Sequence, residues 1–543
     1  MASYSNPKSI ALITTGLFFL YVLLSQNHFP DKIVEDLIVP EQGDARQCRS
    51  RVEFQSYRRK STDPSAESYS PSPALIVPEQ GDARQCRSRV EFQSYRRKST
   101  DPSAESYSPS PALIHRLRRY EQIHARCSRL IQDDPNGDHG DCQFVVWIAP
   151  FGSQGLGNKM LAIASTFLYA LLTNRVLLIA RDSSAENMDR LFCEPFPKSS
   201  WLLPRPLEIR LSTVNDSSRI GHAPDLKITP QHCHDFASSI KFPDVAYSYL
   251  SVDYTPDDRK FFCKEQQKLL QSQVTWLFLR SNVYFAPGLF LVESFRSDLA
   301  KLFPKQQAIF HHLSRYLFHP IDPVWDRTAR FYDSYLARAD RVVGIQMRVP
   351  PHLQGVRQNL AAEVFQCAVE TKILPNISKN NVERIKLRSS ISSQQQQIAA
   401  VVTSLDEHHF DVLREIYLNS STADGSIVRV EQPSHEGQQH TGFLDHDEKA
   451  LAEIYLLGLS DVLITSPGST FGYIGQGLAG LRPWLMWAGP GSGRDICSKA
   501  RTMDPCFFSF GESNCDCGEA VKLDNVERCQ DWPIAPGVQL KTT

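Results

Sequence analysis

The sequence predicts an α/β protein with two doubly wound domains that face each other across a cleft. Apolar strand segments alternate with helical segments, which is typical of parallel sheets covered by helices. This alternation occurs in two clusters, around residues 144–180 and 342–480, far enough apart to belong to separate domains. An apolar run and a polar, repeated segment precede the first cluster. They predict a membrane anchor and a stem ahead of the globular part.

The composition restricts the function classes. The chain has 543 residues with 59 Lys and Arg against 60 Asp and Glu, so its formal net charge is −1. With 41% hydrophobic and 22% charged residues, it is not a wholly disordered, collagen, mucin or coiled-coil chain. The balanced charge argues against nucleic acid as a partner, because binding to phosphates needs a clustered basic excess. An enzyme or a binding protein remains.

The N-terminus predicts the compartment. A short tail at 1–8 precedes the charge-free apolar run IALITTGLFFLYVLL, which lies within residues 9–25. The run is short for a bilayer core, but tilt and boundary residues can close the gap. A cleaved signal peptide is the alternative, although the run is long for one and no clear cleavage site follows. We expect an uncleaved signal anchor with the tail in the cytosol and the rest of the chain in a lumen.

Two further features favour a lumenal chain. The acceptor pattern for N-glycosylation occurs at Asn215, Asn376 and Asn419. The 13 cysteines are scattered, as expected for structural disulfides in an oxidising compartment. Five of them cluster near the C-terminus without Cys-x-x-Cys spacing, so disulfides are favoured over a zinc site. These five are Cys497, Cys506, Cys515, Cys517 and Cys529.

A perfect tandem duplication follows the anchor. Residues 37–74 recur unchanged as 75–112. Two identical units are too few and too similar for a stacked repeat fold, so they indicate a recent duplication or a gene-model error. Their Ser, Pro, Arg and Glu content predicts a stem of limited order over residues 26–114. Cys48 and Cys86 occupy the same position in the two copies, so collapsing one copy would leave an even number of cysteines.

The globular region is expected to form an N-terminal Rossmann-like domain at 115–335 and a C-terminal Rossmann-like domain at 336–543. In the first, a strand, a helix and a second strand form a βαβ unit at 144–149, 158–173 and 175–180. In the second, strands are expected at 342–347, 400–403 and 462–465, and helices at 446–459 and from about residue 471.

Three turns at the ends of predicted strands carry candidate binding groups. The glycines from Gly152 to Gly157 let the backbone approach a ligand, and the helix that follows offers free N–H groups to an anion. Arg348 ends a strand, where its planar guanidinium is well placed to bind a diphosphate. The turn around Ser469 and Thr470 presents hydroxyls at the start of a helix. A tight βα turn, a surface ion pair and helix capping are the respective structural alternatives.

Two weaker patterns have structural interpretations. Asp445-His446-Asp447 has the D-x-D form of a metal-binding nucleotide-sugar site. It opens a helix rather than ending a strand, so N-capping and interaction with the helix dipole are favoured. His311 and His312 are interpreted as structural histidines.

Several long segments closely resemble the plant xyloglucan fucosyltransferase family. They are residues 144–179, 191–204 and 310–320 and the runs VGIQMR, LAEIYLLGLSDVLITS and STFGYIGQGLAGLRPW, and the similarity extends from about residue 113 to 531. The resemblance implies a type II Golgi membrane enzyme with two Rossmann-like domains in the GT-B arrangement. It implies transfer of L-fucose from GDP-fucose to the 2-hydroxyl of galactose, with inversion and without a metal or another cofactor. The acceptor would be a plant cell-wall glycan, and xyloglucan and arabinogalactan protein both stay open, as do a homodimer and complexes with other glycosyltransferases.

The resemblance also implies roles for individual residues. Arg348 matches the arginine expected to hold the pyrophosphate and to act in catalysis. Asn282 takes the place of an acidic residue that is a candidate general base in the family, so a catalytically weak or inactive relative that binds glycan or nucleotide sugar as a scaffold is the alternative. Pro350, Lys159 and Pro467-Gly468 also depart from the family pattern. The other donor-binding positions are Gly155, Gly157, Asn158, Glu436, Ser469, Thr470 and Phe471.

Overall fold

The computed structural model describes the chain in segments, namely 86–95, 107–150, 154–181, 187–208, 214–222, 228, 243–349, 360–378, 395–440, 442–486, 497–508, 515, 524–531 and 537–542. The predicted tail, the anchor at 9–25 and the first copy of the duplication lie outside them, as do Gly152, Pro350 and Cys517. All described segments belong to one unit that begins at Pro71. The domain boundary between 335 and 336 stays a prediction.

The first sheet has four parallel strands in the order β2-β1-β4-β3. Its strands are β1 (Phe144–Ile148), β2 (Val176–Ile179), β3 (Val245–Leu250) and β4 (Trp276–Ser281). In β1 every residue is buried, as expected for a strand that is covered on both faces by helices. Val145 pairs with Leu177 on one side and with Leu277 on the other, which places β1 and β4 at the centre.

The second sheet has six strands in the order β10-β9-β8-β5-β6-β7. Its strands are β5 (Arg341–Gln346), β6 (Gln397–Thr403), β7 (Ile427–Glu431), β8 (Val462–Thr465), β9 (Trp484–Met486) and β10 (Cys497–Lys499). Only β10 pairs antiparallel with its neighbour, so this sheet is also of the doubly wound type. A separate antiparallel pair, β11 (Val526–Arg528) and β12 (Val538–Leu540), lies near the C-terminus. The predicted α/β class with two Rossmann-like sheets is confirmed.

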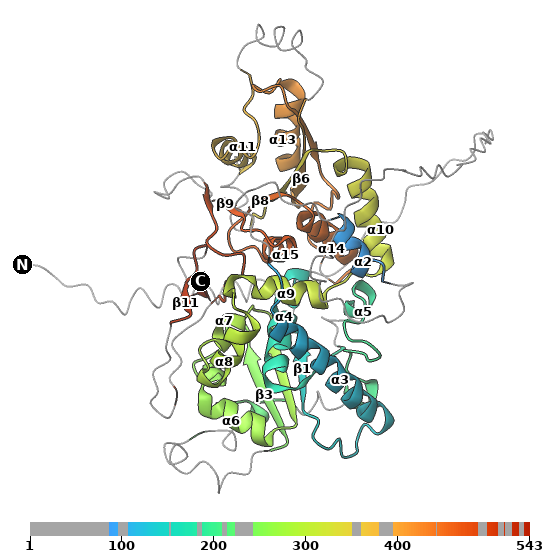
Figure 1. Ribbon diagram of the computed structural model, residues 1–543, viewed down its shortest axis with the longest axis vertical. Coiled ribbons are helices and arrows are strands. Elements are labelled where there is room, and N and C mark those ends of the chain that lie inside the picture. The colour runs from blue at the N-terminus through green and yellow to red at the C-terminus, as the bar shows by residue number, and fades with distance from the viewer. Residues whose placement is uncertain are drawn as a thin grey trace, which may run out of the picture. The chain divides into compact units, whose positions relative to one another are not determined.

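Helices connect the strands and cover the sheets (Figure 1). In the first half they are α3 (Pro111–Asp133), α4 (Leu156–Thr173), α5 (Met188–Leu191), α6 (Lys264–Gln273), α7 (Ala286–Leu289), α8 (Glu293–Leu302), α9 (Ile309–Leu317) and α10 (Asp322–Phe331), with short turns η2 (Asp216–Ser218), η5 (Asp258–Phe262), η6 (Gln306–Ala308) and η7 (Tyr332–Leu336). In the second half they are α11 (Leu360–Glu370), α13 (Glu407–Asn419), α14 (Leu444–Gly458) and α15 (Thr470–Ala479). Among the described helices α4 is long and apolar enough to cross a membrane, but 94% of it is buried inside the protein. Packing explains its composition, because a helix that is apolar all round belongs in a core.

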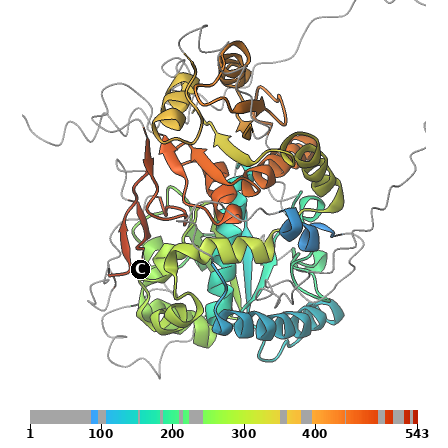
Figure 2. The same cartoon turned by 45° about the horizontal axis from the view of Figure 1, so that its top comes forward.

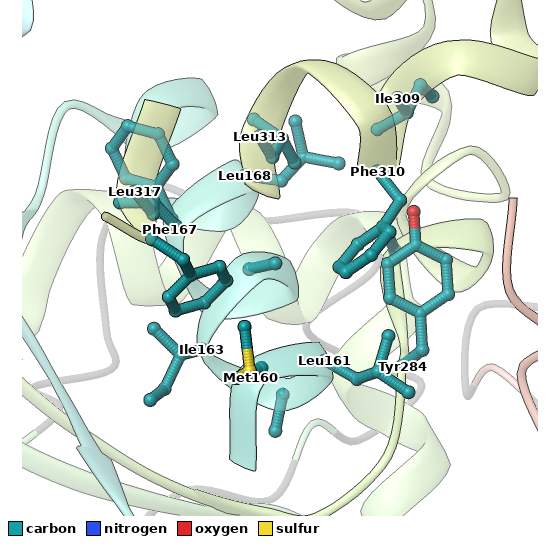
Figure 3. Packing of buried hydrophobic residues seen from close by; sticks show 14 of the residues in the cluster. Met160, Leu161, Ile163, Phe167, Leu168, Tyr284, Ile309, Phe310, Leu313 and Leu317 are labelled. Atoms are coloured by element: carbon teal, nitrogen blue, oxygen red, sulfur yellow. The ribbon is translucent and has the colours of Figure 1, made fainter. Parts of the chain in front are cut away.

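Helices α4, α9 and α15 join the two sheets. Figure 2 shows the yellow-green α9 running between the strands of the two sheets. Figure 3 shows Phe310 of α9 facing Tyr284 and Leu161, and the two aromatic rings pack edge to face with centroids 5.6 Å apart. On α15 a side chain at Gly477 would overlap the ring of Phe310, so glycine is required for this close approach. His311 is buried and its Nδ1 lies 2.6 Å from the carbonyl oxygen of Gly477, while burial lowers the pKa of His312 to about 4. Both fit the structural interpretation.

Part of the second copy of the duplication is folded, which corrects the expectation of limited order at this place. Helix α2 (Ser88–Tyr95) packs Phe92 edge to face against Trp325 and Tyr455, and Glu91 accepts a hydrogen bond of 2.6 Å from the indole Nε1 of Trp325. A disulfide joins Cys86 to Cys193. The segment escapes the compositional prediction because Phe92 is buried among distant aromatic side chains and the disulfide of Cys86 ties the segment to the globular part.

Further disulfides confirm the interpretation of the scattered cysteines. Apart from Cys86–Cys193, the described residues form Cys127–Cys142, Cys263–Cys515, Cys367–Cys497 and Cys506–Cys529. Four of the five clustered C-terminal cysteines are therefore paired, and Cys517 lies outside the described residues.

Candidate active site

The predicted site residues lie at the carboxyl ends of parallel strands. Gln154 to Asn158 follow β1, Asn282 follows β4, Arg348 follows β5, and Ser466 to Thr470 follow β8. In open α/β sheets ligands bind at these edges, because the connecting loops converge there. Hydrogen bonds described below show that the edges of the two sheets meet.

Two helix N-termini come together at this place. Helix α4 begins after Gly155 and helix α15 after Ser469, and neither N-cap residue makes a side-chain capping hydrogen bond. Thr470 Oγ1 donates a hydrogen bond of 3.1 Å to Asn158 Oδ1 and so joins the two helices. A Cβ atom at Gly157 would lie only 2.8 Å from Thr470 Oγ1, so the glycine permits this contact. Both helices direct free N–H groups and the positive ends of their dipoles toward the same region, which favours an anion.

Arg348 supplies a formal positive charge beside these helices. Its backbone N–H donates to Ser466 Oγ over 2.9 Å, which ties the end of β5 to the loop after β8. Its Nη2 donates to Gln439 Oε1 over 2.9 Å. Burial lowers the pKa of Arg348, yet a guanidinium stays charged in proteins. Among the described residues no carboxylate forms an ion pair with Arg348, so its charge is available to a ligand.

Asn282 is held by hydrogen bonds on every side. The side chain is buried, its Oδ1 accepts from Ser251 Oγ over 2.7 Å, and its Nδ2 donates to Gln154 Oε1 over 3.2 Å. Its backbone oxygen accepts from Asn158 Nδ2 over 3.2 Å. Asn158 therefore links Asn282 in the first half to Thr470 in the second half. The amide of Asn282 orders this junction and, as an amide, cannot take up a proton at neutral pH.

Glu436 lies in the segment after β7 and is engaged with α14. Its carboxylate accepts from Lys449 Nζ over 2.7 Å and faces His446 Nδ1 at 2.9 Å. Hydrogen bonds from Lys449 and then His446 lower the pKa of Glu436. These contacts hold the segment that carries Gln439 against the helix, and a role for Glu436 beside the nucleotide stays a prediction. Phe471 is half-buried in the first turn of α15 and packs against the main core.

The Asp445-His446-Asp447 motif lies in the first turn of α14, as predicted, but it does not cap the helix. The N-cap position is Phe443, one residue before the helix, because the chain turns earlier than the acidic pattern suggested. Asp445 forms ion pairs with Lys449 at 2.7 Å and Arg327 at 3.4 Å. Asp447 accepts a hydrogen bond of 3.2 Å from Asn187 Nδ2, and burial raises its pKa.

One further group of side chains in the described part of the chain has metal-like spacing, namely Cys506, Cys529 and Asp531. Its two sulfur atoms form a disulfide, so neither is a thiolate that could bind a metal. Asp531 instead accepts hydrogen bonds from the N–H of Gly468, over 3.2 Å, and from the hydroxyl of Tyr473. Asp531 therefore stabilises the turn before α15.

The three predicted glycosylation sites are exposed. Asn215 is next to η2, Asn376 follows α11, and Asn419 is the last residue of α13. All three asparagines are accessible to a modifying enzyme, and their glycosylation stays a prediction.

Sequence reasoning did not identify Gln439, Ser251 or Gln154. Ser251 follows β3, so its place after a strand was a usable signal once that strand was recognised. Gln439 stands three residues after Glu436 in an irregular segment, and nothing in its local pattern indicates that it reaches Arg348. Gln154 belongs to the glycine turn, whose pattern indicates the close approach of the backbone and not a role for this side chain.

Comparisons with known proteins identify the family and support the fold. The sequence profile of the xyloglucan fucosyltransferase family matches residues 47–517. The galactoside 2-alpha-L-fucosyltransferase of Pisum sativum is 38% identical over 438 residues, which cover 77% of this chain and 74% of the pea protein. The protein of the same name from Arabidopsis thaliana is 37% identical over 452 residues, 79% of this chain and 76% of that protein. The solved structure of an Arabidopsis thaliana FUT1 mutant in complex with GDP aligns with a TM-score of 0.70 and 36% identity over 86% of this chain and 98% of that one.

Proposed function

The chain belongs to the xyloglucan fucosyltransferase family, and on this premise we propose that it transfers L-fucose from GDP-fucose to the 2-hydroxyl of a galactose residue. The observation that carries the proposal is the meeting of two uncapped helix N-termini beside the charge of Arg348. A nucleoside diphosphate is the leaving group in this reaction, and these groups supply what it needs. The similarity to a FUT1 structure with bound GDP supports the same donor.

The reaction breaks the bond between the anomeric carbon of fucose and the β-phosphate oxygen while the galactose 2-hydroxyl attacks from the opposite face. Inversion follows from this single displacement. Arg348 and the N–H groups of α4 and α15 stabilise the negative charge that develops on the departing GDP, because fixed donors need no rearrangement during the reaction. Ser469 and Thr470 add hydroxyl groups at the start of α15. The acceptor proton must leave for water or for the departing phosphate, since Asn282 cannot accept it.

The acceptor and the location of the enzyme are part of the proposal. A galactosylated plant cell-wall glycan is expected as the acceptor, because the family is named for xyloglucan and its relatives for galactosides. Xyloglucan and arabinogalactan protein both stay open as the acceptor. The apolar N-terminal run supports a type II protein of the Golgi membrane with the catalytic part in the lumen. The disulfides among the described residues fit an oxidising lumen.

The test is a GDP-release assay on the purified lumenal chain with GDP-fucose and a panel of galactosylated acceptors. We expect release that depends on one acceptor class and continues in the presence of EDTA, because the cationic groups above replace a metal. Activity that is lost in EDTA and restored by Mn²⁺ would contradict the metal-free mechanism. It would also return Asp445 and Asp447 to consideration as ligands.

A second function, a scaffold that binds nucleotide sugar or glycan without turnover, is favoured by one observation. By the family resemblance Asn282 takes the place of an acidic residue, and its side chain is already hydrogen-bonded to Ser251 and Gln154. Calorimetry with GDP and with acceptor glycans separates the two functions. Binding of both without release of GDP would support the scaffold.

A further inference from the structure

Gln439 lies where the two donor motifs meet, and no role follows for it from the family resemblance. Its Oε1 accepts the hydrogen bond of 2.9 Å from Arg348 Nη2. On its other side, Nε2 lies 3.3 Å from the position that a Cβ atom would take at Gly155. One neutral side chain therefore bonds the guanidinium after β5 and lies beside the glycine turn before α4.

The hydrogen bond between Gln439 and Arg348 is a weak substitute for a bound diphosphate. Among the described residues, Gln439 is the side chain to which the guanidinium of Arg348 donates a hydrogen bond. The acceptor is a single neutral amide oxygen. A diphosphate offers charged oxygens that accept two hydrogen bonds from the planar guanidinium, and such bonds are roughly twice as strong as neutral ones. The nucleotide is therefore able to displace the amide.

The backbone beside Gln439 permits that displacement. Gly437 and Gly442 have φ angles of 66° and 89°, and a Cβ atom at either would meet nothing within 4 Å. Contacts on either side of Gln439 hold the backbone: Glu436 is bound by Lys449, and the carbonyl of Gly442 accepts a hydrogen bond of 2.9 Å from Asn187 Nδ2. The side chain of Gln439 is exposed, so it can leave Arg348 without exposing buried apolar surface.

We propose that the side chain of Gln439 is hydrogen-bonded to Arg348 in the free enzyme and that the diphosphate of the nucleotide sugar displaces it. Donor binding is then a competition between a neutral amide and a charged ligand for one guanidinium. This inference rests on the proposed donor site and adds a residue that sets how readily the donor enters it.

Gln439→Ala tests the competition, and Gln438→Ala is its matched control. Gln438 is the same residue type, one position earlier and equally exposed, and it does not bond Arg348. We expect Gln439→Ala to lower the Kd for GDP roughly threefold to tenfold, which corresponds to the net value of one hydrogen bond. The gain should lie in a faster association rate, measured by stopped flow with a fluorescent GDP analogue. Gln438→Ala should leave both quantities unchanged.

The opposite sign would overturn the proposal. If Gln439→Ala weakens the binding of GDP through faster dissociation, Gln439 contacts the bound donor instead of competing with it. An unchanged Kd and association rate would show that the hydrogen bond does not oppose binding. Failure of the proposed donor site has a different signature, because the unmodified chain would then bind no GDP at all. A chain that binds GDP but does not transfer fucose would fail the proposed function and still allow this test.

Discussion

Replacing Asn282 with aspartate asks whether the enzyme needs a carboxylate at this position. In the structure Oδ1 accepts from Ser251 and Nδ2 donates to Gln154, so the substitution keeps the first hydrogen bond and removes the second. Losing one hydrogen bond costs about 0.5–1.5 kcal/mol, which corresponds to roughly a twofold to tenfold change in rate. Gln154 can reduce this cost by turning its amide so that it donates to the new carboxylate.

A general base would have a much larger effect of the opposite sign. Proton transfer to a positioned base is worth roughly 10²–10⁴-fold. We expect kcat of Asn282→Asp to stay within about tenfold of the original, since the side chain at this position is hydrogen-bonded to Ser251 and Gln154 and links the loops after β3 and β1. Departure of fucose ahead of attack would also leave the acceptor hydroxyl with little need for a strong base.

The assay is initial-rate GDP release at saturating GDP-fucose and acceptor, from pH 5 to 8. Ser251→Ala serves as the control, because it disturbs the same hydrogen-bond chain without adding a carboxylate. A gain of a hundredfold or more in Asn282→Asp, with a new decline in rate at low pH, would refute the reasoning. It would show that the natural asparagine leaves the enzyme without its base.

Three further predictions follow from the described contacts. Arg348→Ala should lower kcat/KM at least a hundredfold, whereas Arg348→Lys should recover part of it, because an ammonium keeps the charge and loses the two-point geometry; near-normal GDP release by the alanine variant would contradict this. Deleting residues 37–74 should leave activity and Tm unchanged, since the second copy retains every residue of the repeated unit. By contrast, Cys86→Ala should lower Tm by several degrees because it removes a disulfide. Burial raises the pKa of Glu453 from about 4.5 to about 8, so its contribution to stability is present below pH 4.5 and is lost as the pH rises to 8. The Tm should fall over this range, and Glu453→Gln should reduce that fall; equal slopes for both proteins would exclude burial of this carboxyl as the cause.

Much of the fold could be predicted because its signals are local. Several elements lie close to their predicted bounds, namely the strands β1, β2 and β8 and the long apolar helix α4. They could be predicted because an element that is buried on all sides has a continuous apolar sequence. The βα turns at Gly155 and Ser469 could also be predicted, because glycine and hydroxyl residues after a strand favour a turn and the start of a helix. The family resemblance supplied the roles of Arg348 and Asn282 in addition.

Other features depended on distance in space. Composition marked residues 86–95 as stem, yet Phe92 finds an aromatic pocket and Cys86 a partner more than a hundred residues away in the sequence. A local sequence pattern does not indicate whether a distant surface will complement a short helix. For the same reason, the acidic pattern at Asp445 did not predict that α14 begins earlier, after Phe443.

The sequence by itself determined the α/β class, the strand-end motifs and the type of ligand that they attract, because backbone pattern and side-chain chemistry act within a few residues. Only the tertiary structure decided which of these motifs share one site. The hydrogen bonds from Thr470 to Asn158 and from Arg348 to Gln439 join residues separated by 312 and 91 positions. Such contacts follow from the packing of α4, α9 and α15 between the sheets, which sums many small interactions spread over the whole chain.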